Sequence, residues 1–231
     1  MHVELHSRPE DGVDLPVLLW RPDGPHLAVS SAPLGGGIGL RRWVLNATVP
    51  MSYSRLDPDQ HLMELAVRFG LDGPGVGLLT GVDVTRRVRT ADGGVTVVAT
   101  VGLGTPTWAA AAEDLQEDRH DLPEKDMPGS GAPVGTINIL ARTPVRLSEA
   151  ALVNAVATMT EAKTQALWDL GVKATGTPTD AVCLMCPPDG EPAPFGGPRS
   201  PWGARLARAV YEAVMQGGHD FLASPWRHAR A

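Results

Sequence analysis

Residues 75–103, GVGLLTGVDVTRRVRTADGGVTVVATVGL, carry the strongest secondary-structure signal in the chain. Two segments rich in valine and threonine, residues that strands favour, are joined by DGG at 92–94, which suits the positive φ angles of a tight hairpin turn. This stretch predicts β-structure. The glycines of GPGVG at 73–77 resemble a dinucleotide-binding fingerprint, but they precede a strand and do not open a helix, so a Rossmann site is not predicted.

The rest of the chain alternates between strand-like and helix-like segments. Asp57 with Pro58, and Ser200 with Pro201, are typical helix starts, and Gly70 is a typical helix end. The expected elements are a hairpin of residues 15–22 and 26–33 with a turn at Asp23-Gly24, strands at 43–49, 134–142 and 180–186, and helices at 58–69, 148–170 and from 201 onwards. This order predicts an α+β (mixed α/β) fold, one domain over residues 1–231, with a largely antiparallel sheet and packed helices.

Charge and composition restrict the partners. The 43% of hydrophobic residues is typical of a soluble globular protein. The formal net charge of −6 disfavours nucleic acid or an anionic membrane as the main partner. The chain shows neither an apolar run of 18 residues nor a signal-peptide pattern, so we expect a cytoplasmic protein, with homo-oligomers left open. Residues 113–133 hold seven acidic and two basic residues and predict a mobile surface loop.

The two cysteines, Cys183 and Cys186, have C-x-x-C spacing. The seven histidines show no zinc-motif spacing to complete a metal site, so we predict no metal bound by protein side chains. Their odd separation on an apolar strand instead predicts two small buried residues on opposite faces of a sheet.

The long helix at 148–170 places a lysine in an apolar stripe. Lys163 follows Leu152, Val156 and Met159 at helical spacing, so it must snorkel, form a salt bridge or take part in chemistry. A second stripe of this helix carries polar side chains, including Asn154 and Glu161. Glu161 and Lys163 lie about 200° apart around the helix axis and are not expected to face each other.

Other polar residues cluster beside strands and glycines. Thr177 and Asp180 lie in ATGTPTDAV, just before an apolar strand, where they either cap a turn or contribute to a site. The motifs NAT at 46–48 and TIN at 136–138 each put an amide and a hydroxyl on one strand face, a combination that suits a large polar ligand or an oxyanion. The glycine loop LGGGIG at 34–39 suits close approach of the backbone to a ligand.

The chain resembles the adenosylcobinamide amidohydrolase family of corrinoid salvage over about residues 17–217. The resemblance rests on eight blocks in order: SAPLGGGIG, NATVP, GPGVGLLTGVDV, ATVGLGTP, GTINIL, ALVNAVATMTEAKTQAL, GTPTDAV and FGGPRSPWGARLARAVYEAV. It implies hydrolysis of the amide that joins aminopropanol to the corrin ring, giving adenosylcobyric acid for vitamin B12 (cobamide) salvage. Cobalt would enter as part of the substrate, and residues 218–231 would be a variable tail.

Amide hydrolysis needs an activated nucleophile and oxyanion stabilisation. We expect Glu161 or Asp180 to activate water, with Lys163, Asn46 and Asn138 assisting. A rival scheme uses Thr48 or Thr136 as a nucleophile, including self-cleavage before Thr136. A corrinoid sensor without catalysis, or an amidase for another amide, also remains open.

The predicted site residues form two sets. The predicted catalytic residues are Asn46, Thr48, Glu161, Lys163 and Asp180. The predicted substrate-binding residues are Gly35, Gly36, Gly37, Gly39, Tyr53, Asp83, Thr136, Asn138, Asn154 and Thr177.

Overall fold

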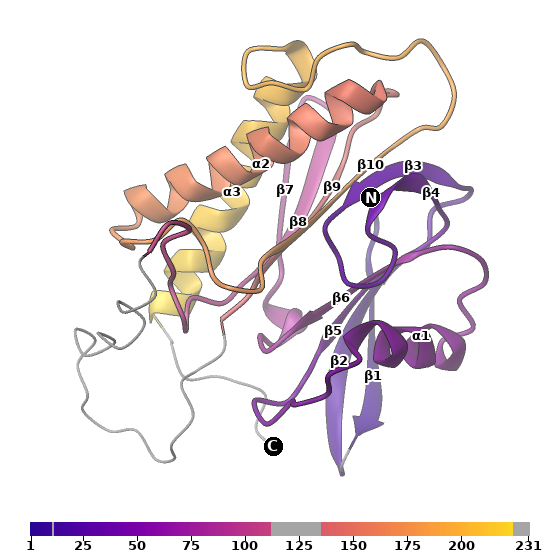
Figure 1. Ribbon diagram of the computed structural model, residues 1–231, viewed down its shortest axis with the longest axis vertical. Helices are drawn as coiled ribbons and strands as arrows, with labels where there is room; N and C mark the ends of the chain where they lie inside the picture. The colour runs from indigo at the N-terminus through magenta and orange to yellow at the C-terminus, as the bar shows by residue number, and fades with distance from the viewer. Residues whose placement is uncertain (11, 112–134, 224–231) are drawn as a thin grey trace.

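The computed structural model describes residues 1–10, 12–111 and 135–223 (Figure 1). Its strands form two sheets. The four-stranded sheet has the order β1-β2-β5-β6, from β1 (Glu4–Glu10), β2 (Val13–Trp20), β5 (Val44–Thr48) and β6 (Val76–Thr80). The six-stranded sheet has the order β4-β3-β10-β9-β8-β7, from β3 (His26–Ser30), β4 (Gly37–Arg41), β7 (Val88–Asp92), β8 (Val95–Val101), β9 (Ile137–Arg142) and β10 (Ala181–Cys186).

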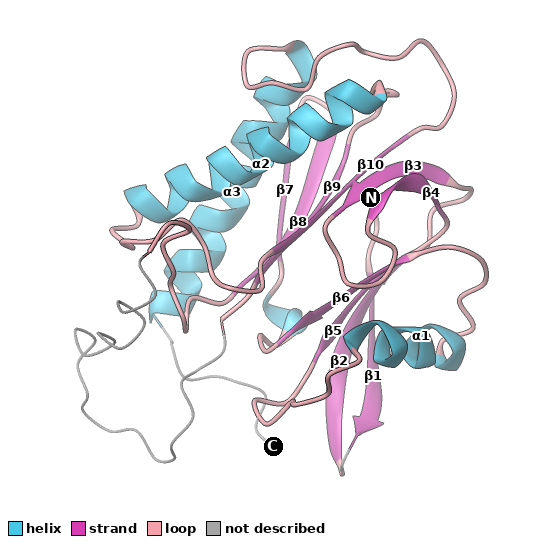
Figure 2. Ribbon diagram, viewed as in Figure 1, coloured by secondary structure: helices cyan, strands magenta, loops and turns pink. Residues whose placement is uncertain are grey.

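Helices cover the outer faces of both sheets (Figure 2). The helices α2 (Glu149–Asp169) and α3 (Pro201–Ala223) pack side by side on the six-stranded sheet, and α1 (Pro58–Arg68) packs on the four-stranded sheet. Apolar clusters lie under α2 and α3 and under α1. A further apolar cluster lies between the inner faces of the two sheets and includes Trp20, Leu78, Leu140 and Met185. The described residues thus form an α+β fold, as the sequence predicts.

The predicted helix starts at Asp57-Pro58 and Ser200-Pro201 are confirmed, because α1 begins at Pro58 and α3 at Pro201. The hydroxyl of Ser148 accepts a hydrogen bond from the backbone N–H of Ala151, and that of Ser200 accepts one from Gly203. Asp57 precedes α1, but its side chain makes no capping hydrogen bond, because it pairs with Arg55. Ion pairing therefore replaces capping at α1.

The predicted hairpin of residues 15–22 and 26–33 is wrong. The strands β2 and β3 belong to different sheets, so the connection at Asp23-Gly24 passes from one sheet to the other. β2 pairs instead with β1, in the register Glu4↔Leu19 to Glu10↔Val13. β1 is an edge strand with a polar sequence, so it gives little apolar signal, and its hydrogen bonds to β2 define it.

The hairpin at residues 92–94 is confirmed. β7 and β8 pair antiparallel, with φ +51° at Gly93 and +92° at Gly94. The first of the two β-rich segments is nevertheless divided, since β6 lies in the four-stranded sheet and β7 in the six-stranded sheet. A 3-10 turn, η1 (Val84–Arg86), connects them. Among the strand pairs of the described residues, β5 with β6 and β9 with β10 are parallel and the others are antiparallel, which confirms the largely antiparallel prediction.

The prediction that the two cysteines are buried on opposite strand faces is confirmed. Cys183 lies in the cluster between the sheets and Cys186 in the cluster under the helices, as expected for opposite strand faces. Among the described residues no group of three or more His, Cys, Asp or Glu could hold a metal ion, and no helix is long and apolar enough to cross a bilayer. The acidic segment 113–133 lies outside the described residues.

Candidate active site

Lys163 forms a nearly buried ion pair with Asp180. Lys163 projects from the sheet-facing side of α2, and its Nζ lies 2.5 Å from Oδ2 of Asp180, which immediately precedes β10. The side chains are 10% and 11% exposed, respectively. An ammonium so buried needs a partner, because losing water costs a charge several kcal/mol. The sequence leaves open whether this lysine snorkels, forms a salt bridge or takes part in chemistry, and the structure shows a salt bridge.

The carboxylate of Asp180 accepts four hydrogen bonds. Oδ1 accepts from the backbone N–H of Ile137 at 2.9 Å and from the hydroxyl of Thr177 at 2.5 Å. Oδ2 accepts from the backbone N–H of Thr177 at 3.0 Å, in addition to Lys163. A carboxylate offers about four lone-pair positions, so these donors occupy its accepting capacity. The geometry fixes Asp180 more firmly than a simple capping residue would be fixed.

Gly176 leaves the space in which the ion pair lies. A Cβ atom on Gly176 would overlap Oδ2 of Asp180 and Nζ of Lys163. The backbone of Gly176 is itself clamped, because its carbonyl accepts a 2.8 Å hydrogen bond from the N–H of Thr107. The chain around Thr107 therefore fixes the segment that bears Thr177.

Two threonine hydroxyls adjoin this cluster. Oγ1 of Thr136, directly before β9, lies 2.6 Å from Oγ1 of Thr179. Thr136 is 3% exposed. This pair links the N-terminal ends of the parallel strands β9 and β10.

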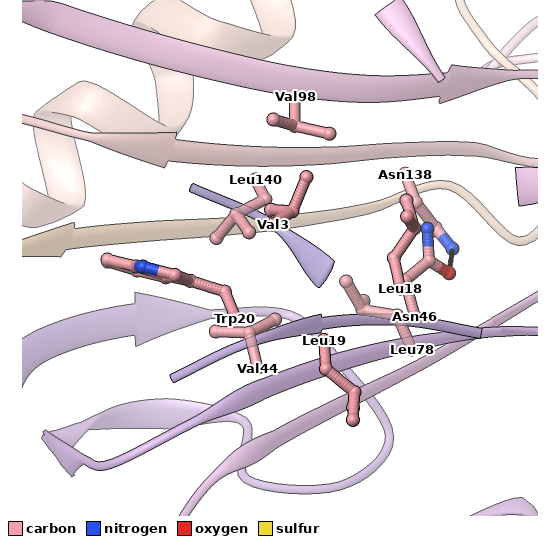
Figure 3. A pocket seen from close by; sticks show the side chains of 10 residues that line it. All are labelled: Val3, Leu18, Leu19, Trp20, Val44, Asn46, Leu78, Val98, Asn138 and Leu140. Atoms are coloured by element: carbon pink, nitrogen blue, oxygen red, sulfur yellow. Dashed lines mark hydrogen bonds between the residues drawn. The ribbon is translucent and has the colours of Figure 1, made fainter. Parts of the chain in front are cut away.

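Asn46 and Asn138 meet between the two sheets (Figure 3). The Asn138 amide donates to Oδ1 of Asn46 at 3.0 Å and to the carbonyl of Leu79 at 2.9 Å, and the Asn46 amide donates to the hydroxyl of Thr100 at 3.2 Å. Oδ1 of Asn138 is buried without a hydrogen-bond partner in the described part of the chain. The adjoining cavity has a volume of about 20 Å³, enough for one water molecule.

The amide pair and the ion pair lie on opposite faces of the same strand ends. Asn138 is in register with Ala181, and Ala181 faces the cluster between the sheets. Val182 faces the helices, so Asp180, two residues earlier, points to that side. The structure thus brings Lys163, Asp180 and Thr177 together and places Asn46 and Asn138 behind them.

Thr48, a predicted catalytic residue, is buried and hydrogen-bonded to the backbone of the turn after β6. Its hydroxyl donates to the carbonyl of Val82 at 2.9 Å and accepts from the N–H of Val84 at 3.1 Å, and the residue is 0% exposed. These bonds fix the turn after β6. Asp83 in the same turn accepts from the N–H of Thr85 at 2.9 Å and caps η1.

The glycine loop begins beside the site but is largely packed against the protein. Ser31 exchanges hydrogen bonds with Val182, two residues after Asp180. Gly35 has φ +73°, and the carbonyl of Gly75 fills the space of its missing side chain. The guanidinium of Arg41 covers the carbonyls of Gly35 and Gly36 and also lies against Gly39, whereas Gly37, with φ +84°, has open space beside it.

Tyr53 belongs to a second, unpredicted polar cluster. Its hydroxyl lies 3.0 Å from Nδ1 of His61, whose Nε2 lies 3.8 Å from Glu10. Glu10 pairs with Arg8, which is 1% exposed and donates to the carbonyl of Thr48 at 3.0 Å. Burial lowers the pKa of His61 and raises that of Tyr53. Arg8 and Glu10 occur in a polar segment without a recognisable motif, so the sequence offers no signal for this cluster.

Glu161 and Asn154 lie apart from the ion pair. Both are exposed on α2, and Glu161 makes no hydrogen bond or ion pair within the described ranges. The amide oxygen of Asn154 faces the loop at Gly197, next to the start of α3. Asn154 is nine residues from Lys163, about 13 Å along the helix axis. Because Glu161 is exposed and the ion pair is nearly buried, Glu161 does not share the environment of Lys163 and Asp180.

Comparisons with known proteins agree with the family resemblance found in the sequence. A family model described as adenosylcobinamide amidohydrolase matches residues 2–224. A protein of that name from Methanosarcina mazei is 30% identical over 203 residues, 84% of this chain and 90% of the relative. Another of that name, from Halobacterium salinarum, is 40% identical over 137 residues, 59% of this chain, and the match spans about half (55%) of that relative's length.

A solved structure, the PH0078 protein from Pyrococcus horikoshii OT3, aligns with 93% of this chain and 83% of its own chain at 12% identity and a TM-score of 0.44.

The family match extends over nearly all of the described fold and includes both strand ends of the candidate site. The chain is a member of a class of hydrolases that act on an amide bond. It belongs to the adenosylcobinamide amidohydrolase family.

Proposed function

We propose that this protein hydrolyses adenosylcobinamide at the amide between the corrin ring and the aminopropanol arm. The products would be adenosylcobyric acid, which can re-enter cobamide synthesis, and aminopropanol. The observation that carries the proposal is the family match over residues 2–224, together with a relative aligned over 90% of its own length. Cobalt enters this reaction as part of the corrinoid.

Lys163 and Asp180 form the proposed reaction centre. An ammonium carries three N–H donors and Asp180 takes one, so Lys163 can donate to the amide oxygen as negative charge develops on it. Asp180 holds that ammonium in position through a short, nearly buried contact. Both side chains retain about a tenth of their surface exposed, which gives a substrate amide access from outside.

The small cavity beside Asn46 and Asn138 cannot hold the corrin ring, which favours binding of the ring at the surface. The cavity beside Asn46 and Asn138 has room for about one water molecule, far less than a macrocycle requires. In this proposal the ring lies outside the strand ends, near the glycine loop that Ser31 connects to β10, and only the amide arm reaches Lys163. Asn138 supports the strand end from behind and does not contact the scissile bond.

A corrinoid-binding protein without catalysis is the second candidate. The observation that favours it is the saturation of Asp180, because a carboxylate with four donors is also what a purely structural ion pair would show. The two candidates differ in turnover and agree in binding.

The deciding experiment is incubation of the purified full-length protein with adenosylcobinamide, followed by chromatography and mass spectrometry. We expect adenosylcobyric acid and aminopropanol in equal amounts from the wild type, with strong loss in Lys163→Met and Asp180→Asn. Glu161→Gln tests the exposed carboxylate as an alternative base. Retention of corrinoid without product would favour the binding protein, and neither retention nor product would refute the proposed substrate.

A further inference from the structure

We propose that the hydroxyl of Thr177 is the nucleophile of the reaction. This inference rests on the proposed amide hydrolysis and specifies which atom attacks the carbonyl carbon. Oγ1 of Thr177 lies 2.5 Å from Oδ1 of Asp180, whose other oxygen lies 2.5 Å from Nζ of Lys163. The three groups form a continuous hydroxyl, carboxylate and ammonium series.

The donors at Asp180 distinguish Thr177 from an activated water. Two of the four are backbone N–H groups, from Ile137 and Thr177, and one is the ammonium of Lys163. Because these donors leave Asp180 no accepting position, a water molecule would first have to displace one of them. The Thr177 hydroxyl is already in contact, and it is the one donor whose oxygen attacks a carbonyl once its proton moves to the carboxylate.

The other candidate threonines lack this contact. The Thr48 hydroxyl donates to a backbone carbonyl, and the residue is 0% exposed. Thr136 contacts another hydroxyl, that of Thr179. A hydroxyl needs an adjacent base to become a good nucleophile, and among these threonines Thr177 has one.

The backbone around Thr177 positions its hydroxyl. Pro178 follows Thr177, the N–H of Thr177 donates to Oδ2 of Asp180, and Gly176 is clamped by Thr107. The side chain is therefore held from both neighbours. Such fixed placement lowers the entropic cost of reaching the attacking geometry.

The reaction then proceeds in two steps, formation of an ester on Thr177 and hydrolysis of that ester. Thr177 Oγ1 bonds to the amide carbon while its proton passes to Asp180, and Lys163 donates to the developing oxyanion. Collapse breaks the C–N bond, and the departing aminopropanol nitrogen takes the proton from Asp180, leaving a corrinoid ester on Thr177. Water attacks this ester and gives its proton to Asp180; the ester C–O bond breaks, Oγ1 regains that proton, and adenosylcobyric acid is released.

A matched pair of valine variants tests this assignment. Thr177 and Thr90 are each 9% exposed, and each hydroxyl donates to an oxygen acceptor, that of Thr90 to the carbonyl of Ala209 at 2.7 Å. Thr177→Val and Thr90→Val thus remove comparable groups, one at the site and one under α3. We expect kcat on adenosylcobinamide to fall by about 10³-fold or more in Thr177→Val. Thr90→Val should stay within about threefold of the wild type, and Thr177→Ser should retain measurable turnover.

A covalent intermediate gives a second readout that is independent of the loss of kcat. Wild-type enzyme quenched in acid during turnover should show a mass increase equal to the corrinoid acyl group, mapped to the peptide containing Thr177. Added hydroxylamine should divert part of the product to the hydroxamate in the wild type and not in Thr177→Val.

The outcomes separate this inference from the proposed function. Wild-type turnover with activity in folded Thr177→Val within tenfold of normal, or an adduct at another residue, overturns Thr177 and leaves the hydrolase intact. Absence of product from the wild type overturns both. Loss of kcat together with an adduct on Thr177 supports both.

Discussion

The carboxylate of Asp180 accepts a 2.9 Å hydrogen bond from the backbone N–H of Ile137, on the neighbouring parallel strand. The proposed reaction centre is therefore part of the contact between β9 and β10. A side chain that belongs both to a strand junction and to an ion pair affects stability and activity together. Variants at this site must be judged by both measurements.

Gly176→Ala should disrupt the Lys163–Asp180 pair without changing either side chain. The added methyl group has no space beside Oδ2 of Asp180 and Nζ of Lys163. Overpacking of this kind typically costs about 1–3 kcal/mol, so we expect a lower unfolding midpoint in urea and a loss of hydrolysis. Gly24→Ala is the control, because nothing lies within 4 Å of a Cβ there. Equal activity of the two variants would contradict the packing.

Lys163→Met should destabilise the protein more than the double variant Lys163→Met/Asp180→Asn. Removing the ammonium leaves a nearly buried carboxylate without its cation, which costs about 3–5 kcal/mol in comparable buried pairs. Neutralising Asp180 as well removes the unpaired charge, so part of the loss should return. Urea denaturation of both single variants and the double variant gives the coupling energy. Purely additive losses would show that the pair contributes little to folding.

The structure makes stability depend on pH through His61. Burial is the largest cause of its lowered pKa, so the folded protein favours the neutral ring. The unfolded chain binds the proton first, near the ordinary value of about 6.5. The contribution of the neutral His61 ring to the free energy of unfolding should therefore be fully present above about pH 6.5. It should decline as the pH falls towards the lowered folded pKa.

His61→Gln should reduce this decline between pH 7 and pH 5.5 in urea denaturation. His26 retains a further part of it, because burial lowers its pKa too. His219→Gln, a change at an exposed residue of α3, serves as the control. An unchanged pH profile in His61→Gln would show that the slope originates elsewhere.

The two thiols should be unreactive in the folded protein. Burial raises the pKa of Cys183 to about 12, and burial also raises that of Cys186. At pH 8 only about 10⁻⁴ of Cys183 would be thiolate, the reactive form. An aromatic disulfide reagent should label neither cysteine within the time needed to label both in urea. Rapid labelling of native protein would indicate that β10 opens readily.

The sequence anticipates elements whose signal is local. The DGG turn, the Ser200 cap and the opposite faces of Cys183 and Cys186 depend on neighbouring residues and are found where expected. Strand pairing is not local, so the sequence wrongly predicts a hairpin of β2 and β3, which lie in different sheets. Burial of both faces of β2 gives no periodicity that would reveal its true partners, β1 and β5.

The same distinction applies to the candidate site. A lysine on an apolar helical stripe indicates a buried partner, and the TPTD segment indicates a fixed carboxylate, but their contact spans 17 residues and requires the fold. Gly176 and Ile137 matter through space and backbone atoms, which no side-chain pattern encodes. The cluster of Arg8, Glu10 and His61 likewise arises from the pairing of β1 and the docking of α1.

The hydrogen bond between Asn46 and Asn138 should couple the two sheets energetically. Asn138 is 2% exposed and donates to both Asn46 and the carbonyl of Leu79, so it connects β9 to β5 and β6. Replacing Asn138 by alanine leaves buried acceptors unsatisfied, which typically costs about 1–3 kcal/mol. In a double-mutant cycle with Asn46→Ala we expect a coupling of at least about 0.5 kcal/mol, because residues in one hydrogen-bond network do not act independently. Additive effects in urea denaturation would mean that the sheets are held by apolar packing alone.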